Sequence, residues 1–181
     1  MGYDAYRALP EGAGYDLLGG LCFREPMPTV DHQLVVDDIV GLLRRHARRT
    51  GVGRACREID VHLDAENCPA PDVAFISTAR LPMLNHHGLH GIAPDLCAEV
   101  LSPRTARRDR GAKADLYARY GCREYWLVDP EEPAVEVLRP GADGAFDRAG
   151  RFRRGELFDC AAVPGLRVAV AAVFADDGLE P

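Results

Sequence analysis

Hydrophobic and polar positions repeat with two different periods along the chain, and each period predicts a kind of element. Residues 30–51 carry apolar side chains at the spacing of one helix face and end in arginines and Gly51, which predicts a helix. Residues 55–64 alternate apolar and polar positions, which predicts a half-buried strand. After a turn-rich break, residues 71–77 predict a short second strand that opens with proline.

The middle of the chain continues with a loop, a strand, a helix and a strand. Residues 78–94 contain scattered glycines and prolines and predict a long loop, whereas residues 95–102 are nearly all apolar and predict a strand buried on both faces. Residues 105–120 predict a helix that Gly121 closes, and residues 124–130 predict a fourth strand. This order indicates an α/β (α+β) fold with a mixed central β-sheet flanked by helices.

The length of the chain and its later pattern define the expected domain. The 181 residues are enough for one hydrophobic core, so we expect a single domain over residues 1–181, with its core at about 30–130. Short runs that begin at residues 134–140 predict a hairpin and a β-rich C-terminal extension over about 131–175.

Composition limits the expected cellular location of the protein and the kinds of partner that it attracts. No window approaches the roughly 18 apolar residues of a transmembrane helix. The N-terminal segment lacks a basic start followed by an apolar run, so we expect no signal peptide and a cytoplasmic location, where the six scattered cysteines stay reduced. A net charge of −6 argues against broad attraction to nucleic acid but allows a local basic groove.

Two carboxylates occupy positions that call for a chemical explanation. Asp72 follows a proline at the start of the second predicted strand, and Glu99 lies inside the nearly apolar third strand. An unpaired carboxylate in a buried strand is costly, so it must become neutral, pair with a cation or bind a metal ion. The simpler alternatives are a turn residue for Asp72 and a buried salt bridge to an arginine for Glu99.

Lys113 is the single lysine of a chain that otherwise uses arginine for positive charge. It shares its helix face with Leu116 and Tyr117, which form the apolar, sheet-facing side, so we expect its ammonium to point inward near the strand ends. Asp109, four residues earlier, offers the alternative of an ordinary surface ion pair with Lys113.

Asp72, Glu99 and Lys113 together form a candidate catalytic set. Carboxylates on neighbouring strands bind a hard divalent cation such as Mg²⁺ (or Mn²⁺), which keeps several of its waters. The ion lowers the pKa of a bound water and stabilises the transition state of phosphodiester hydrolysis, while a nearby ammonium orients the attacking water. Lysine suits this task better than arginine because it is a compact charge whose pKa shifts when it is buried.

Several segments resemble one known family of proteins. They are "YDLLGG", "PDVAFIS", "APDLCAEVLSPRT", "RDRGAKADLYARYGCREYWLVDP" and "VEVL". Over roughly residues 3 to 175 the chain resembles the Uma2 family (DUF820) of restriction endonuclease-like proteins, which is assigned to the PD-(D/E)xK nuclease superfamily. The resemblance implies a restriction endonuclease-like αβββαβ core, a Mg²⁺-dependent hydrolase activity on DNA, and assembly as a homodimer.

The resemblance also implies roles for individual residues. Asp72 and Glu99 become the metal-binding acids, and the backbone carbonyl of Val100 becomes a further ligand. In the superfamily a lysine often stands two residues after the strand acid. Leu101 occupies that position here, so the resemblance implies that Lys113 supplies the ammonium from the following helix.

The N-terminal motif departs from the family pattern. Members commonly read "YELIDGEL", whereas this chain reads "YDLLGGLC", so that Asp16 is a conservative change and Leu21 replaces the second glutamate. If that glutamate helps to bind metal or a partner, the change favours a protein without full activity. His32 falls where members often carry a histidine and is a candidate contact to metal-bound water or phosphate, the alternative being a polar contact at the helix start.

Three further groups are candidates for the substrate or for a metal. Arginines beside the proposed site predict phosphate contacts, and a tyrosine on the inward helix face is a further candidate for substrate contact. These residues are Arg104, Arg107, Arg108 and Tyr117. The segment with His86, His87 and His90 invites a zinc interpretation, but its glycines and the lack of a cysteine partner favour a loop beside the site.

Three hypotheses follow from the sequence. The leading one is a Mg²⁺-dependent endonuclease that hydrolyses DNA. The second is a catalytically weak or inactive nuclease-fold module that binds DNA or a protein partner, which Leu21 and the net acidity favour. The third is a structural protein in which Asp72, Glu99 and Lys113 form a buried salt-bridge network.

Overall fold

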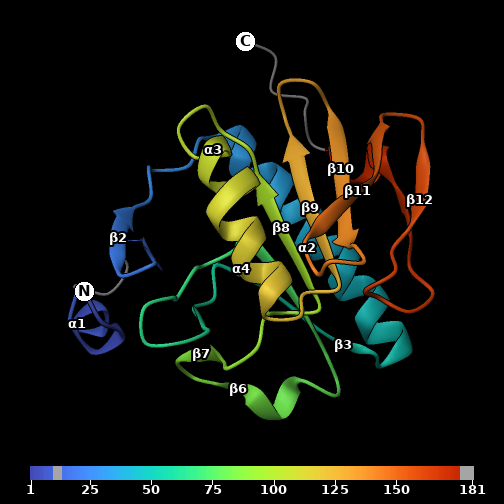
Figure 1. Cartoon of the computed structure of the whole chain (residues 1–181). Coiled ribbons are helices and arrows are strands. Elements are labelled where there is room, and N and C mark those ends of the chain that lie inside the picture. Colours follow the sequence, from blue (N-terminus) through green and yellow to red (C-terminus); the bar gives the residue numbers. More distant parts are fainter. Residues whose placement is uncertain (10–13, 176–181) are drawn as a thin grey trace.

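A six-stranded sheet forms the centre of the computed structural model, which describes residues 1–9 and 14–175 (Figure 1). Its strands, in spatial order, are β11 (Phe146–Arg153), β10 (Ala134–Pro140), β9 (Glu124–Asp129), β8 (Leu96–Val100), β5 (Val73–Ser77) and β3 (Gly53–Arg57). Neighbouring strands are antiparallel except β8 and β9, which are parallel and connected by a helical crossover. The predicted mixed sheet with flanking helices is therefore confirmed.

Helix α2 (Val30–Thr50) packs on one face of the sheet. The Thr29 hydroxyl accepts a hydrogen bond from the backbone N–H of His32 (3.2 Å), and Gly51 ends the helix in a left-handed conformation. The buried stripe that contacts the sheet consists of Val35, Val36, Ile39, Val40, Leu43 and Ala47. The helix predicted over residues 30–51 is thus confirmed.

The crossover from β8 to β9 packs on the other face, as Figure 1 shows for its helical part. It runs through α3 (Ala106–Arg108), the π-helical turn η2 (Asp109–Lys113) and α4 (Ala114–Arg119). The predicted helix over residues 105–120 is confirmed, but the sequence pattern gave no sign of the π turn. Such turns widen the helix locally and are frequent at functional sites.

The strand predicted over residues 55–64 is wrong as a continuous element. The chain leaves β3 at Glu58, which has a positive φ of 50°, and residues Val61–His62 form the separate strand β4. β4 pairs with β7 (Gly88–His90), and β7 also pairs with β6 (Leu84–Asn85). The short 3-10 helix η1 (Leu81–Met83) directly precedes β6 along the chain. The long loop predicted over residues 78–94 therefore contains part of a small three-stranded sheet.

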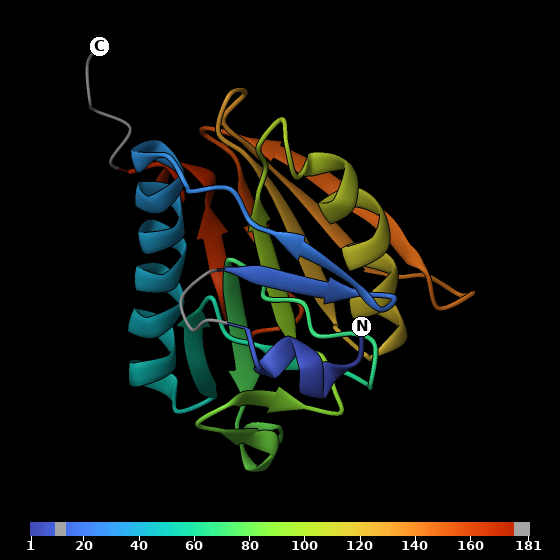
Figure 2. The same cartoon turned by 90° about the vertical axis from the view of Figure 1, so that its left-hand side faces the viewer.

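An N-terminal hairpin covers part of the molecule between the two helical layers. It follows α1 (Tyr3–Arg7) and consists of β1 (Tyr15–Leu18) and β2 (Leu21–Arg24). Figure 2 shows the hairpin crossing in front of the main sheet, between α2 and α4. A backbone hydrogen-bonded bridge between Leu17 and Cys68 fixes β1 to the segment before β5.

The C-terminal part completes the core on the α2 side. It contains β12 (Leu157–Asp159), β13 (Arg167–Ala169) and η3 (Val170–Ala172). Trp126 on β9 is fully buried against Phe158, and its indole N–H donates to Glu124. None of the helices in the described part of the chain has the length and apolar composition that a bilayer crossing requires.

Candidate active site

The site lies where β5 and β8 separate. The two strands pair from Phe75–Leu96 to Val73–Ala98, and beyond this point the backbone N–H of Val100 donates to the Asp72 carboxylate (2.7 Å). The side chain of Asp72 thus takes the place of a backbone acceptor at the end of β8 and stays 21% exposed. This position explains why an acid follows the proline at the start of β5.

His32 holds the same carboxylate from the first turn of α2. Its Nε2 lies 3.2 Å from Oδ2 of Asp72. Burial lowers the pKa of His32, but the hydrogen bond to Asp72 and the charges of Asp72 and Glu58 outweigh this and raise it above its ordinary value. The second ring nitrogen, Nδ1, is buried without a hydrogen-bond partner among the described residues.

Glu99 lies on the face of β8 that α4 covers. Ala98 and Val100 pack with the α2 layer, so the strand alternation turns Glu99 to the opposite side. Its side chain is buried, the Tyr117 hydroxyl donates to its Oε1 (3.2 Å), and the Lys113 ammonium lies 3.1 Å from the same atom. Burial raises the pKa of Glu99 well above its ordinary value despite the opposing charge of Lys113.

Lys113 points inward, as its helix face predicts, and only 2% of its surface is exposed. Its ammonium lies 3.0 Å from Asp16, 3.1 Å from Glu99 and 3.9 Å from Asp109, and it donates to the carbonyl of Ala70 (3.3 Å). The Asp109 pair is therefore buried rather than a surface pair. Burial lowers the pKa of Lys113, but the surrounding carboxylates raise it well above its ordinary value, so the ammonium is charged.

Asp16 is the partner of Lys113 that the sequence did not single out as a site residue. It is fully buried on β1, and its Oδ1 accepts the backbone N–H of Ala70 (2.7 Å). Burial raises the pKa of Asp16, but the ammonium of Lys113 and the hydrogen bonds outweigh this and hold it below its ordinary value. The only available signal was the match of Asp16 to the first glutamate of the family motif.

Leu21, which replaces the second glutamate of that motif, lies at the turn of the hairpin and is 64% exposed. Glu25, directly after β2, reaches the cluster instead. It forms an ion pair with Arg108, whose Nε also lies 3.7 Å from Asp16. Burial raises the pKa of Glu25 to about 8, and the neighbouring Asp16 contributes to this rise through a hydrogen bond and through its charge. No sequence signal pointed to Glu25.

The carboxylates around Lys113 outnumber the cations. Five acids meet one lysine, one arginine and one histidine; the acids are Asp16, Glu25, Asp72, Glu99 and Asp109. Oδ1 of Asp109 is buried without a hydrogen-bond donor among the described residues. A surplus of buried negative charge is relieved by protonation or by a bound cation, so this environment fits a hard divalent ion.

The ligand set would be small. Among the described residues, no three His, Cys, Asp or Glu side chains converge as a ready-made metal site. Two carboxylates and a carbonyl suit Mg²⁺, which retains several waters, and do not suit zinc, which takes three or four protein ligands. Asp72, Glu99 and the Val100 carbonyl are the groups that fit the ion.

A cleft of about 1470 Å³ gives access to this cluster. Asp72, Glu99 and Lys113 all contribute to its lining, as do His32 and Arg104. The sequence-predicted acids, lysine and histidine are thus brought together on one concave surface. Their predicted catalytic and metal-binding roles stay predictions.

The other predicted substrate residues lie in different settings. Arg104 is exposed and lines the cleft, whereas Arg107 is exposed on α3 and does not line it. Arg108 is engaged with Glu25 and Asp16, and its guanidinium lies over the ring of Phe23 (5.2 Å). Tyr117 is fully buried, so its hydroxyl contacts Glu99 and is positioned away from the open cleft.

The histidine segment forms the β6–β7 hairpin rather than an irregular loop. His86 and His87 are exposed, contact one another and line the rim of the cleft. His90 lies apart from them and has its Nδ1 3.2 Å from Nδ1 of His62. The three histidines therefore do not form one cluster.

The chain is similar to a known protein family and to a solved structure. A family model described as "Uma2: Putative restriction endonuclease" matches residues 3–171. Among solved structures, a protein whose crystal structure is described as that of "a putative nuclease belonging to DUF820" from Anabaena variabilis ATCC 29413 is similar, with a TM-score of 0.81 and 22% identity over 97% of this chain and 98% of the other. At this identity the likeness shows the shared fold. No curated protein matches the chain.

Proposed function

This chain belongs to the Uma2 family, and from that premise we propose that it is a Mg²⁺-dependent endonuclease that hydrolyses phosphodiester bonds in DNA. Membership and the nuclease-like fold support a nuclease in general terms. The metal dependence, the DNA substrate and the mechanism are our proposal.

One observation carries the proposal. Two acids from neighbouring strands and the single lysine of the chain meet at the point where β5 and β8 separate, on the wall of a large cleft. An ammonium held by Asp16 and Glu99 is charged, buried and fixed in position. A purely structural ion pair needs no access to such a cleft.

Each side chain has a task in this proposal. Asp72, Glu99 and the Val100 carbonyl would hold the divalent ion, which would supply Lewis-acid stabilisation of the scissile phosphate and a more acidic water. Lys113 donates hydrogen bonds that orient the attacking water or the negatively charged phosphate. Tyr117 and Asp16 are positioning residues, because the first contacts Glu99 and the second contacts Lys113. His32 fixes the orientation of Asp72.

The test is cleavage of plasmid and linear duplex DNA with Mg²⁺ or Mn²⁺, with EDTA as the metal-free control. We expect Glu99→Gln and Asp72→Asn to abolish cleavage, and Lys113→Met to reduce its rate by about 10²–10³-fold, the effect of removing one transition-state donor. Asp115→Asn, on the exposed side of α4, is the matched control and should cleave normally. Cleavage that survives Glu99→Gln would reject the mechanism.

A second readout does not depend on activity. Titration calorimetry with Mn²⁺ should show binding to the wild type that Asp72→Asn and Glu99→Gln each weaken, because each removes a hard oxygen ligand. Asp115→Asn should bind like the wild type. Unchanged Mn²⁺ binding in both site variants would place the metal elsewhere.

The alternative is a nuclease-fold module that binds DNA or a protein without cleavage. The depth of the cluster favours it, because Glu99 and Lys113 are nearly fully buried and already satisfy one another. This alternative predicts DNA or protein binding with no cleavage in any divalent metal. A homodimer and a cytoplasmic location stay predictions, of which sedimentation velocity would check the first.

A further inference from the structure

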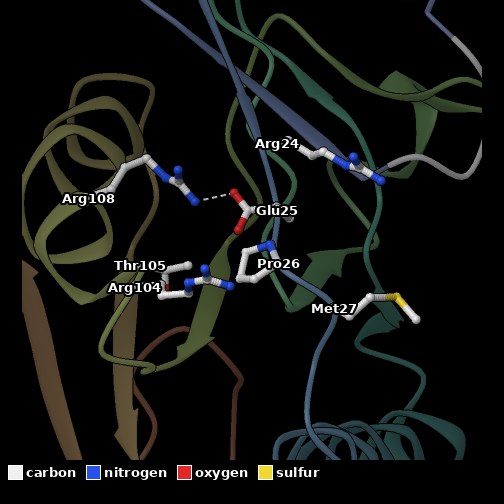
Figure 3. Close-up of a pocket in the computed structure, with 7 residues that line it drawn as sticks. All are labelled: Arg24, Glu25, Pro26, Met27, Arg104, Thr105 and Arg108. Atoms are coloured by element: carbon white, nitrogen blue, oxygen red, sulfur yellow. Dashed lines mark hydrogen bonds and ion pairs between the residues drawn. The ribbon is translucent and has the colours of Figure 1, made fainter.

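A second, smaller pocket opens beside the acid–lysine cluster. It has a volume of about 460 Å³ and is lined by Arg24, Glu25, Pro26, Met27, Arg104, Thr105 and Arg108. Figure 3 shows that its three arginines come from two segments: Arg24 from the end of the N-terminal hairpin, and Arg104 and Arg108 from the start and the end of the segment that runs into and through α3. We call this cavity, with Arg24, Arg104 and Arg108 in its lining, the arginine pocket. Six of the seven lining residues also line the large cleft, so the two spaces are continuous.

Positive charge in this pocket is largely uncompensated. Within the described ranges 1–9 and 14–175, the side chains of Arg24 and Arg104 have no ion-pair or hydrogen-bond partner, and both residues are exposed. Arg108 pairs with Glu25 and lies 3.7 Å from Asp16. Three guanidinium groups around one cavity stand out in a protein whose net charge is −6.

Glu25 cancels only part of this charge near neutral pH. Burial and the neighbouring Asp16 raise the pKa of Glu25 to about 8, although Lys113 and Arg108 oppose the shift. The raised pKa means that Glu25 compensates Arg108 less fully near pH 7 than an ordinary glutamate would, although the two remain partners. The arginine pocket thus keeps the uncompensated charge of Arg24 and Arg104 and part of the charge of Arg108.

We infer that the arginine pocket binds a backbone phosphate of the nucleic acid substrate, next to the phosphate that is cleaved. This rests on the proposed function and adds the residues that hold the substrate. Guanidinium groups bind phosphate oxygens in pairs and fix the register of a nucleic acid backbone. Arg24 and Glu25, which the sequence pattern did not mark, thereby become part of the substrate site.

The location supports this assignment. Arg108 and Lys113 both approach Oδ2 of Asp16, at 3.7 and 3.0 Å, so a single carboxylate oxygen separates the pocket from the catalytic ammonium. Apolar side chains line the pocket beside the arginines: Met27 is 93% exposed and stands next to Pro26. An apolar surface beside guanidiniums suits a nucleotide, which carries a base next to its phosphate.

Binding of a fluorescein-labelled 20-base-pair DNA duplex, followed by anisotropy in EDTA, tests the inference without cleavage. We expect the double variant Arg24→Gln/Arg104→Gln to raise the Kd about tenfold at 100 mM salt and to reduce the slope of log Kd against log salt by about one, the change for one lost phosphate contact. Arg45→Gln/Arg48→Gln is the matched control, since it removes the same charge from exposed positions near the far end of α2. It should bind like the wild type.

The outcomes separate the inference from the proposed function. Equal weakening in both double variants would show general electrostatic attraction and overturn the inference, and so would an unchanged Kd in Arg24→Gln/Arg104→Gln or a wild type that does not bind DNA. Absence of metal-dependent cleavage would defeat the proposed catalysis but leave the comparison of binding intact. A single strand of the same sequence shows whether the pocket also accepts unpaired nucleic acid, and it should show the same dependence on Arg24 and Arg104.

A pH series adds a test of Glu25. The groups that face its carboxyl are Asp16 on β1, Arg108 on α3 and Lys113 on η2. As the pH rises through about 8, Glu25 loses its proton and competes with phosphate for Arg108, so wild-type binding should weaken. Glu25→Gln should bind with the same affinity across this range. Equal pH dependence in both proteins would exclude the competition.

Discussion

Replacement of Lys113 by methionine removes the central charge of the site and keeps a side chain of similar length. In the wild type the ammonium is 3.0 Å from Asp16, 3.1 Å from Glu99 and 3.9 Å from Asp109, with almost no exposure to solvent. The variant leaves these buried carboxylates without their shared cation. They must then either stay charged at a high desolvation cost or take up protons.

Protonation sets the size of the effect. The cost falls mainly on Asp16, because the ammonium holds its pKa below the ordinary value in the wild type, whereas the pKa of Glu99 is already raised there. A carboxyl with an ordinary pKa near 4 costs about 1.4 kcal/mol to protonate for each pH unit above that value, so about 4 kcal/mol at pH 7. This agrees with the roughly 3–5 kcal/mol found when one partner of a buried pair is removed. At pH 5 the cost for one carboxyl falls to about 1.4 kcal/mol. We therefore expect Lys113→Met to lose about 4 kcal/mol of unfolding free energy at pH 7 and much less at pH 5.

The sign follows from the direction of each pKa shift. In the variant, the folded-state pKa values of the acids rise above their unfolded values, so the folded state binds more protons and the penalty grows as the pH rises. In the wild type, Lys113 has a raised pKa, so its stabilising contribution is fully present below its ordinary pKa near 10.5. The difference between the two proteins should therefore widen from pH 5 to pH 8.

Urea unfolding followed by the fluorescence of Trp126 measures this difference, because Trp126 is the single, fully buried tryptophan. With a slope of about 2 kcal/mol/M, a loss of 4 kcal/mol shifts the midpoint by about 2 M at pH 7. Arg119→Met, exposed on the same helix, is the control and should keep the wild-type midpoint. A loss in Lys113→Met below about 1 kcal/mol, or one that is equal at pH 5 and pH 8, would refute the buried-charge reasoning.

A double variant examines the same interaction from the other side. Lys113→Met/Glu99→Gln lacks both the cation and one of the acids that it neutralises. It should be more stable at pH 7 than Lys113→Met alone, with a coupling of about 1–3 kcal/mol. If the two losses simply add, Glu99 and Lys113 do not depend on one another in the folded protein.

Three further predictions concern other parts of the fold. Gly88→Ala should destabilise the protein strongly, because φ at this position is +124° and a Cβ would lie 2.1 Å from the carbonyl oxygen of Asp60. Gly91→Ala should cost only about 1–2 kcal/mol, because φ is +73° there but the space around a Cβ is open. Urea unfolding midpoints compare the two variants. Thr29→Ala should cost about 1 kcal/mol in the same assay through loss of the α2 cap, and a Thr29→Ser variant that fails to restore it would contradict this. Glu25→Gln should flatten the dependence of unfolding free energy on pH, because the raised pKa of Glu25 makes the wild type lose stability between about pH 4.5 and 8. An unchanged profile in the variant would show that Glu25 titrates normally.

Local pattern was sufficient for the main elements and for part of the site. The apolar stripe over residues 30–51 and the apolar run over residues 95–102 reported burial directly, and both elements are present. Glu99 was conspicuous because it interrupts an apolar strand, and Lys113 because it shares a face with apolar residues. Each of these inferences needed only neighbours within one strand or one helix, which periodicity describes well.

Other features depended on contacts between distant segments. The alternation over residues 55–64 continues past Glu58, where the chain turns away to join a different sheet, so its period alone could not show the break. The π turn at η2 likewise leaves no mark in the apolar pattern. Asp109 and Lys113 both lie in this turn and are buried.

The sequence by itself determined the order of the main helices and strands along the chain, the burial of Glu99 and the inward face that carries Lys113. Only the tertiary structure decided which acids share that lysine: Asp16 arrives from a hairpin nearly one hundred positions earlier, and the same hairpin brings Arg24 to the pocket that Arg104 also lines. The physical reason is that hydrophobic periodicity specifies which side of an element is buried. The partners of a buried charge are set by how separate elements pack, and no local pattern contains that information.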